Sequence, residues 1–155
     1  MRILFVCLGN ICRSPAAEGI FNNLLKIHNL EDRVTSDSAG ILGYHEGEGA
    51  YHKMKNIALK RGYHLLSVSR PVRPEHDFEN FDLIIGMDDQ NIADLNRMAP
   101  TGKLKSKIRK MTDFCTRHNH KAVPDPYYGE SKDYELVVDL LEDACEGLIA
   151  AIKSA

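Results

Sequence analysis

The chain has 155 residues and a formal net charge of −2, with an ordinary share of apolar and charged residues for a globular protein. This length fits one domain with a buried core and is too short for two typical domains. The charge creates no basic field that would draw the protein to nucleic acid, so an anionic substrate would need a local site.

No segment is apolar for long enough to cross a bilayer, so we expect no membrane partner. The apolar run 3–6 is too short for a signal peptide, and we expect a cytoplasmic chain. Four cysteines are too few for a disulfide scaffold, and they form no paired zinc motif. Cys115 with His118 and His120 lacks a second half, so a polar loop is the better interpretation and we expect no metal there.

The first half of the sequence alternates strands and helices. Residues 2–7 predict a buried strand, since their apolar run is continuous. Ser14-Pro15 predicts a helix start, with Ser14 as N-cap and Pro15 in the first helical position. Apolar residues then recur with helical spacing, at Ala17, Ile20, Phe21, Leu24 and Ile27. A strand over 34–38, a glycine-rich loop and a helix over about 50–61 follow, the last closed by Gly62.

The second half continues the alternation. A polar segment with Pro71 and Pro74 leads to a buried strand over 81–86. Asp88 or Asp89 is predicted to cap a helix that continues to about Met98. Further elements are a short strand over 107–111, a polar loop over 115–130 and an amphipathic helix over 131–153.

We therefore expect a single domain over residues 1–155 with a three-layer α/β/α architecture. Its sheet would be small and parallel, with about four strands and helices on both faces. In such sheets, sites lie at the carboxyl ends of the strands. The loop after the first strand is accordingly the first place to look for function.

That loop carries a Cys-x5-Arg-Ser pattern from Cys7 to Ser14. A loop that enters a helix N-terminus points backbone N–H groups and the helix dipole at one centre, where an anion binds. Gly9 leaves room for a ligand, and Asn10 tolerates a left-handed backbone. Arg13 can hold two oxygens of a phosphate. The same field favours the thiolate form of Cys7, which could attack phosphorus.

Asp125 is the candidate for an acid that protonates a leaving oxygen. It lies in Pro124-Asp125-Pro126-Tyr127-Tyr128, where prolines restrict the backbone on both sides. Tyr127 and Tyr128 could wall a slot for an aromatic ring. An Asp-Pro pair alone is most often just a turn, so Asp125 depends on the Cys7 loop for its interpretation.

These segments resemble a known family. Residues 6–15, VCLGNICRSP, are similar to the signature loop of low-molecular-weight protein tyrosine phosphatases. Residues 125–128, DPYY, resemble their general-acid loop. Residues 37–40 and 87–88 also resemble family segments, and the similarity spans essentially the whole chain in order and spacing.

The resemblance implies a role for each site residue. Cys7 would form a phosphocysteine intermediate, Arg13 would bind the phosphoryl oxygens, and Asp125 would first protonate the tyrosyl oxygen and then activate water. Ser14 would hydrogen-bond the sulfur and make it a better leaving group. The substrate-binding set would be Leu8, Gly9, Asn10, Ile11, Cys12, Ser14, Tyr44, Tyr127 and Tyr128.

The resemblance also implies supporting features. Asn10 and Ser38 would hold the shape of the loop. Cys12 could pair with Cys7 under oxidant, which would make inactivation reversible. No metal or other cofactor would be required. The partners would be phosphotyrosine-containing proteins, and we expect a monomer, with a weak dimer as the alternative.

Four positions depart from the family pattern. Members usually have a histidine near position 67, bonded to the loop asparagine, but this chain has Ser67, with His64 three residues earlier. Tyr44 stands where a tryptophan is common. Tyr51 and Lys53 replace a common aspartate and arginine. These departures concern substrate preference and loop support more than the chemistry.

Three other functions compete with this interpretation. A thioredoxin-coupled arsenate reductase shares the loop but needs relay cysteines, which the middle of this chain lacks. A protein arginine phosphatase tends to carry threonine where this loop has Ile11. A non-catalytic phosphate-binding module would keep Arg13 but has no reason to keep Cys7 and Asp125 together.

Overall fold

Four parallel strands form a single sheet in the computed structural model, which describes residues 1–155. The strand order is β2-β1-β3-β4, so the first strand lies inside the sheet. The strands are β1 Arg2–Cys7, β2 Thr35–Gly40, β3 Leu83–Gly86 and β4 Ile108–Lys110. All four predicted strands are therefore confirmed, with shifts of two residues or fewer at their ends.

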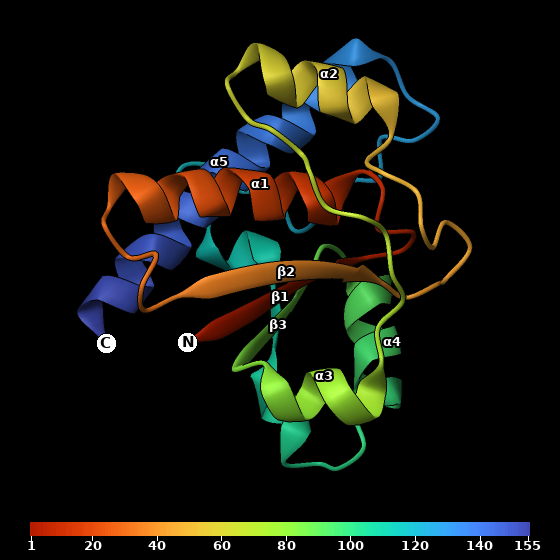
Figure 1. The fold of residues 1–155 in the computed structure, drawn as a ribbon, viewed down its shortest axis with the longest axis vertical. Helices are drawn as coiled ribbons and strands as arrows, with labels where there is room; N and C mark the ends of the chain where they lie inside the picture. The colour runs from red at the N-terminus through yellow and green to blue at the C-terminus, as the bar shows by residue number, and fades with distance from the viewer.

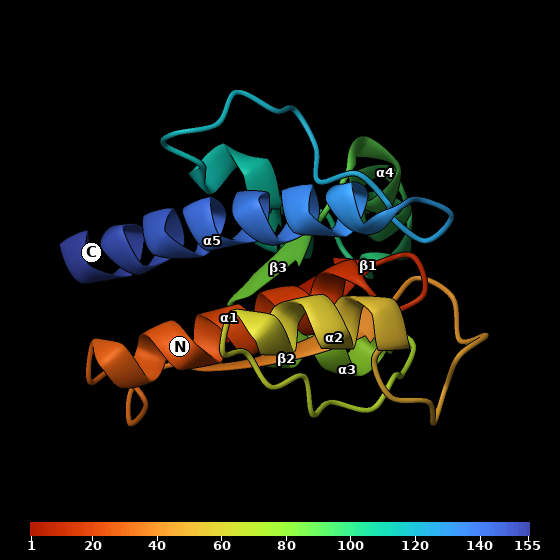
Figure 2. The same ribbon diagram turned by 90° about the horizontal axis from the view of Figure 1, so that it is seen from above.

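Helices cover both faces of the sheet, which confirms the three-layer prediction. Helices α1, α2 and α5 lie on one side, and α3 and α4 lie on the other (Figure 1). Seen from above, α1 and α5 lie side by side (Figure 2). The helices are α1 Arg13–Ile27, α2 His52–Lys60, α3 Pro74–Asn80, α4 Asp89–Met98 and α5 Ser131–Ser154, with short 3₁₀ turns η1 Leu104–Lys107 and η2 Met111–Phe114.

Alternation along β1 divides the core between the two faces. Ile3 and Phe5 belong to the larger cluster beneath α1 and α5, while Leu4 and Val6 belong to the smaller cluster with α3 and α4. All four side chains are fully buried. A strand covered on both faces reads as a continuous apolar run, which explains the pattern of residues 2–7.

Two details of the predicted first helix are wrong. Ser14 is not the N-cap, because α1 begins at Arg13 and Cys12 precedes it without any side-chain cap. The Ser14 hydroxyl is buried and bonded elsewhere, as described below. Ile27, in the last turn of α1, is 64% exposed and not part of the buried stripe.

Helix α3 was not predicted, since residues 74–80 read only as a polar segment. Its start does carry two signals: Pro74 opens the first turn, and Asp77 accepts a hydrogen bond from the backbone N–H of Arg73 at 2.7 Å. The Asp88 alternative for the cap of α4 is confirmed, because its side chain accepts from the Asn91 backbone N–H. None of the helices combines the length and apolarity that a membrane crossing requires.

The loop over residues 115–130 folds around a buried carboxylate. Asp143, on α5, is fully buried and accepts from the backbone N–H groups of Thr116, Arg117 and His118 at 2.9–3.0 Å. The His118 ring also lies 2.8 Å from it. Burial alone would raise the pKa of Asp143, but these hydrogen bonds hold it well below its usual range. His118 therefore anchors the loop through Asp143.

Candidate active site

The loop between β1 and α1 is held in place by hydrogen bonds that its carbonyl groups accept from neighbouring segments. The carbonyls of Cys7 and Leu8 accept from the backbone N–H groups of residues 41 and 42 at 2.9 Å, and that of Ile11 accepts from Tyr51 at 2.8 Å. The N–H groups of residues 8–12 have no acceptor within the protein. Asn10 has the left-handed φ of 57° that its residue type tolerates. The loop thus keeps a set of free donors at the start of α1, which is an anion-binding arrangement.

The Cys7 thiol lies at the bottom of this loop. Cys7 is 3% exposed, and its Sγ lies 3.0 Å from the Ser14 Oγ. Asn10 Nδ2 donates to the same hydroxyl at 2.8 Å. Because Ser14 accepts from Asn10, its own proton is free for the sulfur, which is nearer than the Ala39 carbonyl at 3.5 Å. Such a donor stabilises a thiolate.

Asn10 is fully bonded without any histidine. Its amide also donates to Ser38 Oγ at 3.0 Å, and its Oδ1 accepts from the Arg70 backbone N–H at 3.0 Å. Ser38 in turn donates to Glu18 Oε1 at 2.6 Å. His64 is exposed on a groove beside α1 and makes no bond to Asn10. Ser38 and Glu18 therefore brace the asparagine here.

Arg13 is aimed into the same site by partners far away in the sequence. Its side chain is 3% exposed, and Nη1 donates to Asp88 Oδ2 at 2.6 Å and to the Val123 carbonyl at 3.0 Å. Nη2 lies 3.8 Å from Asp125 Oδ2. A guanidinium fixed on one edge presents its other donors to a ligand.

The loop that carries Asp125 is anchored by aromatic contacts. Asp125 is 45% exposed, and its Oδ1 accepts from the Tyr127 backbone N–H at 3.1 Å. The Tyr127 ring packs against Tyr51 and Tyr128, each with ring centroids 4.9 Å apart. Tyr134, on α5, donates its hydroxyl to the Tyr127 carbonyl at 3.2 Å. These contacts hold Asp125 over the pocket while leaving its carboxyl group accessible to water.

A pocket of about 410 Å³ joins these groups. It is lined by Cys7, Leu8, Gly9, Ile11, Cys12, Arg13, Leu42, Tyr44, His45, Asp125, Tyr127 and Tyr128. Of the predicted site residues, Asn10, Ser14 and Ser38 lie behind the pocket instead, in the network that carries Cys7. Tyr44 and Tyr128 form its rim and are 85% and 97% exposed.

Four residues around the site were not predicted for it. Leu42 lines the pocket, Tyr51 supports Tyr127, Asp88 holds Arg13 and Glu18 braces Ser38. Asp88 had a sequence signal as a helix cap and within the family-like segment 87–88, but none for holding Arg13. The others have no local signal, because their contacts join segments far apart in the chain.

The second cysteine of the loop stays in its thiol form. Burial, reinforced by the neighbouring Cys7, raises the pKa of Cys12 to about 12. Cys12 is also 4% exposed. A buried thiol with so high a pKa is a poor nucleophile, which leaves Cys7 as the candidate on this loop.

A thiol and a guanidinium at one helix N-terminus, with a carboxylic acid facing them, are the arrangement of a cysteine-dependent phosphatase. The comparisons with known proteins agree. Residues 2–155 match the model of the family described as low molecular weight phosphotyrosine protein phosphatase. The chain belongs to this family and is a protein tyrosine phosphatase of its low-molecular-weight class.

Individual relatives match over nearly their full length. The low molecular weight protein-tyrosine-phosphatase YfkJ of Bacillus subtilis is 40% identical over 151 residues, which cover 97% of this chain and 95% of the relative. The crystal structure of a protein tyrosine phosphatase from Entamoeba histolytica superposes with a TM-score of 0.96 at 48% identity, covering 99% of this chain and 97% of that one. A Drosophila arginine phosphatase superposes with a TM-score of 0.91 at 29% identity, covering 99% and 98%.

Proposed function

We propose that the chain hydrolyses phosphotyrosine in proteins through a phosphocysteine intermediate on Cys7. The observation that carries the proposal is the pocket in which Cys7, Arg13 and Asp125 face one space beside Tyr127 and Tyr128. A phosphoryl group at the loop would meet the free N–H donors and the guanidinium. Its aromatic ester would extend between the tyrosine rings.

In the first step, Cys7 Sγ attacks phosphorus and the bond from phosphorus to the aryl oxygen breaks. Asp125, in its acid form, gives its proton to that oxygen so that a neutral phenol leaves. The loop N–H groups and Arg13 hold the phosphoryl oxygens throughout the transfer.

In the second step, water attacks the phosphocysteine and Asp125, now a carboxylate, takes the proton from that water. The bond from phosphorus to sulfur breaks, and Cys7 leaves as a thiolate. The Ser14 hydroxyl, 3.0 Å from Sγ, stabilises this leaving group.

Phosphoarginine is the competing substrate, since a Drosophila arginine phosphatase shares the fold. Two features support phosphotyrosine. Ile11 is 7% exposed and presents to the pocket an apolar side chain, which itself offers a guanidinium no hydrogen bond. The aromatic walls of Tyr127 and Tyr128 suit a phenyl ring.

The deciding experiment compares phosphotyrosine, phosphoarginine and phosphoserine peptides side by side, together with arsenate plus thioredoxin. We expect the highest kcat/KM for phosphotyrosine, without added metal and without activity of Cys7→Ser. Asp125→Ala should slow the release of poor leaving groups most. A fully active Cys7→Ser variant, or equal losses for phenols of very different pKa in Asp125→Ala, would refute the assigned roles.

The finer properties are also part of the proposal. We propose a cytoplasmic monomer of one domain, in which mild peroxide links Cys7 to Cys12. The four cysteines are free in the structure, and these two lie on one tight loop. Mass mapping after peroxide should find the Cys7–Cys12 disulfide. Sulfinic acid on Cys7 with Cys12 untouched would contradict it.

A further inference from the structure

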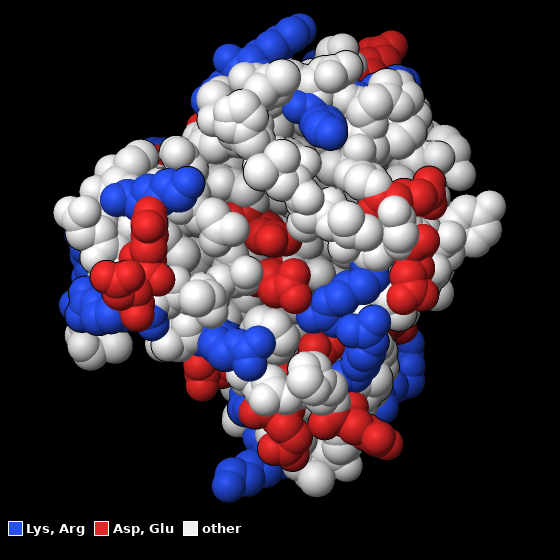
Figure 3. Space-filling view, viewed as in Figure 1, with Lys and Arg blue, Asp and Glu red and all other residues white.

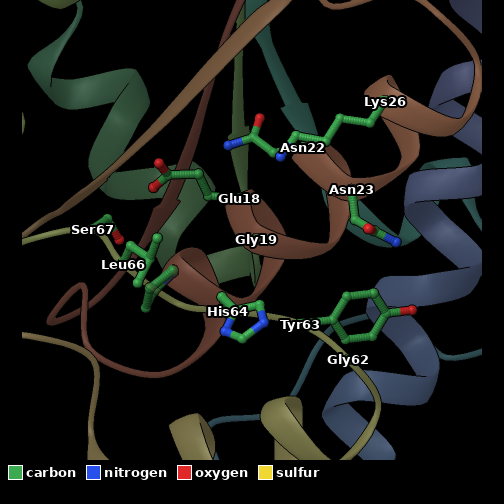
Figure 4. A pocket seen from close by; sticks show the side chains of 11 residues that line it. Glu18, Gly19, Asn22, Asn23, Lys26, Gly62, Tyr63, His64, Leu66 and Ser67 are labelled. Carbon is green, nitrogen blue, oxygen red and sulfur yellow. The ribbon is translucent and has the colours of Figure 1, made fainter.

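A second, polar groove lies outside the pocket described above. It has a volume of about 300 Å³ and runs between α1 and the segment 62–67 that follows α2. Its lining comes from Pro15, Glu18, Gly19, Asn22, Asn23, Lys26, Gly62, Tyr63, His64, Leu66 and Ser67. Figure 4 shows Glu18 and Ser67 on one side of the groove, with Asn23 and Tyr63 on the other. We call it the α1 groove.

The groove owes its shape to a close approach of two segments. A Cβ atom at Gly19 would lie 2.5 Å from Leu65 Cδ2 and 3.4 Å from the His64 carbonyl oxygen. Leu65 is 2% exposed and anchors the segment on α1, while His64 and Leu66 on either side of it are exposed. The floor of the groove is therefore fixed by packing and is present without a ligand.

Glu18 is a carboxylate without a cationic partner on this floor. Glu18 Oε1 accepts a hydrogen bond from the Ser38 hydroxyl at 2.6 Å. The Glu18 side chain takes part in none of the ion pairs of the protein. Burial raises the pKa of Glu18, and Asp37 on β2 raises it further. The charge of Arg70 partly offsets this rise in the pKa of Glu18, but its ion pairs are with Asp37 and the fully buried Asp77.

No other charged or titratable group of the groove forms an ion pair with Glu18. Lys26 lies two turns further along α1 and is exposed, and His64 is exposed on the facing segment. In the space-filling view, acidic atoms reach the surface in the middle of this face, over α1 and β2 (Figure 3). A half-buried carboxylate that faces a polar groove favours a ligand carrying positive charge.

We propose that the α1 groove binds a small organic cation, an alkylguanidinium or alkylammonium, with Glu18 as its counter-charge. The amide of Asn23 has no partner within the protein and lines the groove, so it can accept a donor of the ligand. The Tyr63 ring flanks the space while its hydroxyl is bonded to Glu142 at 2.5 Å, which leaves the ring face for a cation.

The groove is joined to the nucleophile by four consecutive hydrogen bonds. Glu18 accepts from Ser38, Ser38 accepts from Asn10, Asn10 donates to Ser14 and Ser14 bonds to Cys7. A cation that pairs with Glu18 weakens this carboxylate as an acceptor for Ser38, and so loosens the chain that aims Ser14 at the sulfur. Occupancy of the groove therefore lowers turnover, a consequence that rests on the proposed phosphatase function.

The binding test uses n-propylguanidinium as probe and n-propylurea as a neutral molecule of the same shape. Each is titrated into ¹⁵N-labelled protein in saturating inorganic phosphate, which occupies the Cys7 pocket. We expect saturable amide shifts at Gly19 and Ser67 at about millimolar n-propylguanidinium, and none with the urea. Glu18→Gln should weaken binding about tenfold or more, whereas Glu31→Gln, an exposed acid beyond α1, should not.

Equal binding of the urea, or unchanged binding by Glu18→Gln, would overturn the site. The coupling is tested separately, by kcat/KM on an aryl phosphate with n-propylguanidinium at constant ionic strength. A fall of about 2-fold or more in the unmodified chain, absent in Glu18→Gln, supports it. An unchanged kcat/KM overturns the coupling. Failure of the phosphatase assay without probe would instead refute the proposed function and leave the binding result standing.

Discussion

The Asp88→Asn substitution separates two contacts that one carboxylate makes. Asp88 Oδ1 caps α4 by accepting from Asn91 at 2.7 Å, and Oδ2 accepts from Arg13 at 2.6 Å. Asparagine caps helices about as well as aspartate, but its NH₂ would face the Arg13 donor. Loss of such a charge-assisted hydrogen bond costs about 1.5–3 kcal/mol. If that loss appears in the transition state, kcat/KM falls roughly 10- to 150-fold.

The assay measures kcat/KM on a phosphotyrosine peptide together with unfolding in urea. Asp88→Ala should lose the same activity and, in addition, about 1 kcal/mol of stability through the missing cap. Asp89→Asn is the matched control, because Asp89 is 84% exposed and pairs only with Lys110 on the surface. Unchanged kcat/KM in Asp88→Asn, or an equal loss in Asp89→Asn, would refute this account of Arg13.

Three further predictions concern stability. Asp143→Asn should cost roughly 3 kcal/mol at neutral pH, since buried N–H donors lose a charged acceptor. Its lowered pKa means that this stability is present above the unfolded value of about 3.9 and is lost as the pH falls. Glu18 has a raised pKa, so the unmodified chain should lose stability relative to Glu18→Gln as the pH rises above about 4.3. Gly147→Ala should cost about 1–3 kcal/mol, because its Cβ would lie 1.8 Å from the Phe114 carbonyl oxygen.

Urea unfolding at several pH values checks all three. Glu146→Gln is the control for Asp143, since Glu146 is half-exposed and pairs with Arg117 on the surface. Gly102→Ala is the control for Gly147, because nothing lies within 4 Å of its added Cβ. An Asp143→Asn variant that unfolds like Glu146→Gln would contradict the first prediction. Parallel pH curves for the unmodified chain and Glu18→Gln would contradict the second, and a Gly147→Ala variant as stable as Gly102→Ala would contradict the third.

The fold was predictable from the sequence where local patterns agree with tertiary packing. Residues 3–7 of β1 are buried on both faces of the sheet, and their continuous apolar run predicts this directly. Helix α3 was missed because only Asp77 and Phe78 of its seven residues are buried, which leaves almost no apolar period to detect. Ser14 was misread as a cap because its type suits both a cap and a buried hydrogen bond to sulfur.

The candidate site was likewise predictable only where its residues lie close together in the sequence. Cys7 and Arg13 share one loop, so their spacing carries the signal within the sequence. The partners that orient Arg13 come from residues 75 and 110 positions away, Asp88 and Val123. Glu18 reads simply as a polar position on a helix. Such contacts depend on the folded topology, and no local pattern marks them.

The most direct test of the central claim is a rapid-quench experiment during turnover of a phosphotyrosine peptide, with mass mapping of the quenched protein. We expect a phosphoryl group on Cys7 that forms and decays at least as fast as kcat. Turnover without phosphoryl on Cys7, or with phosphoryl on another residue, would contradict the mechanism.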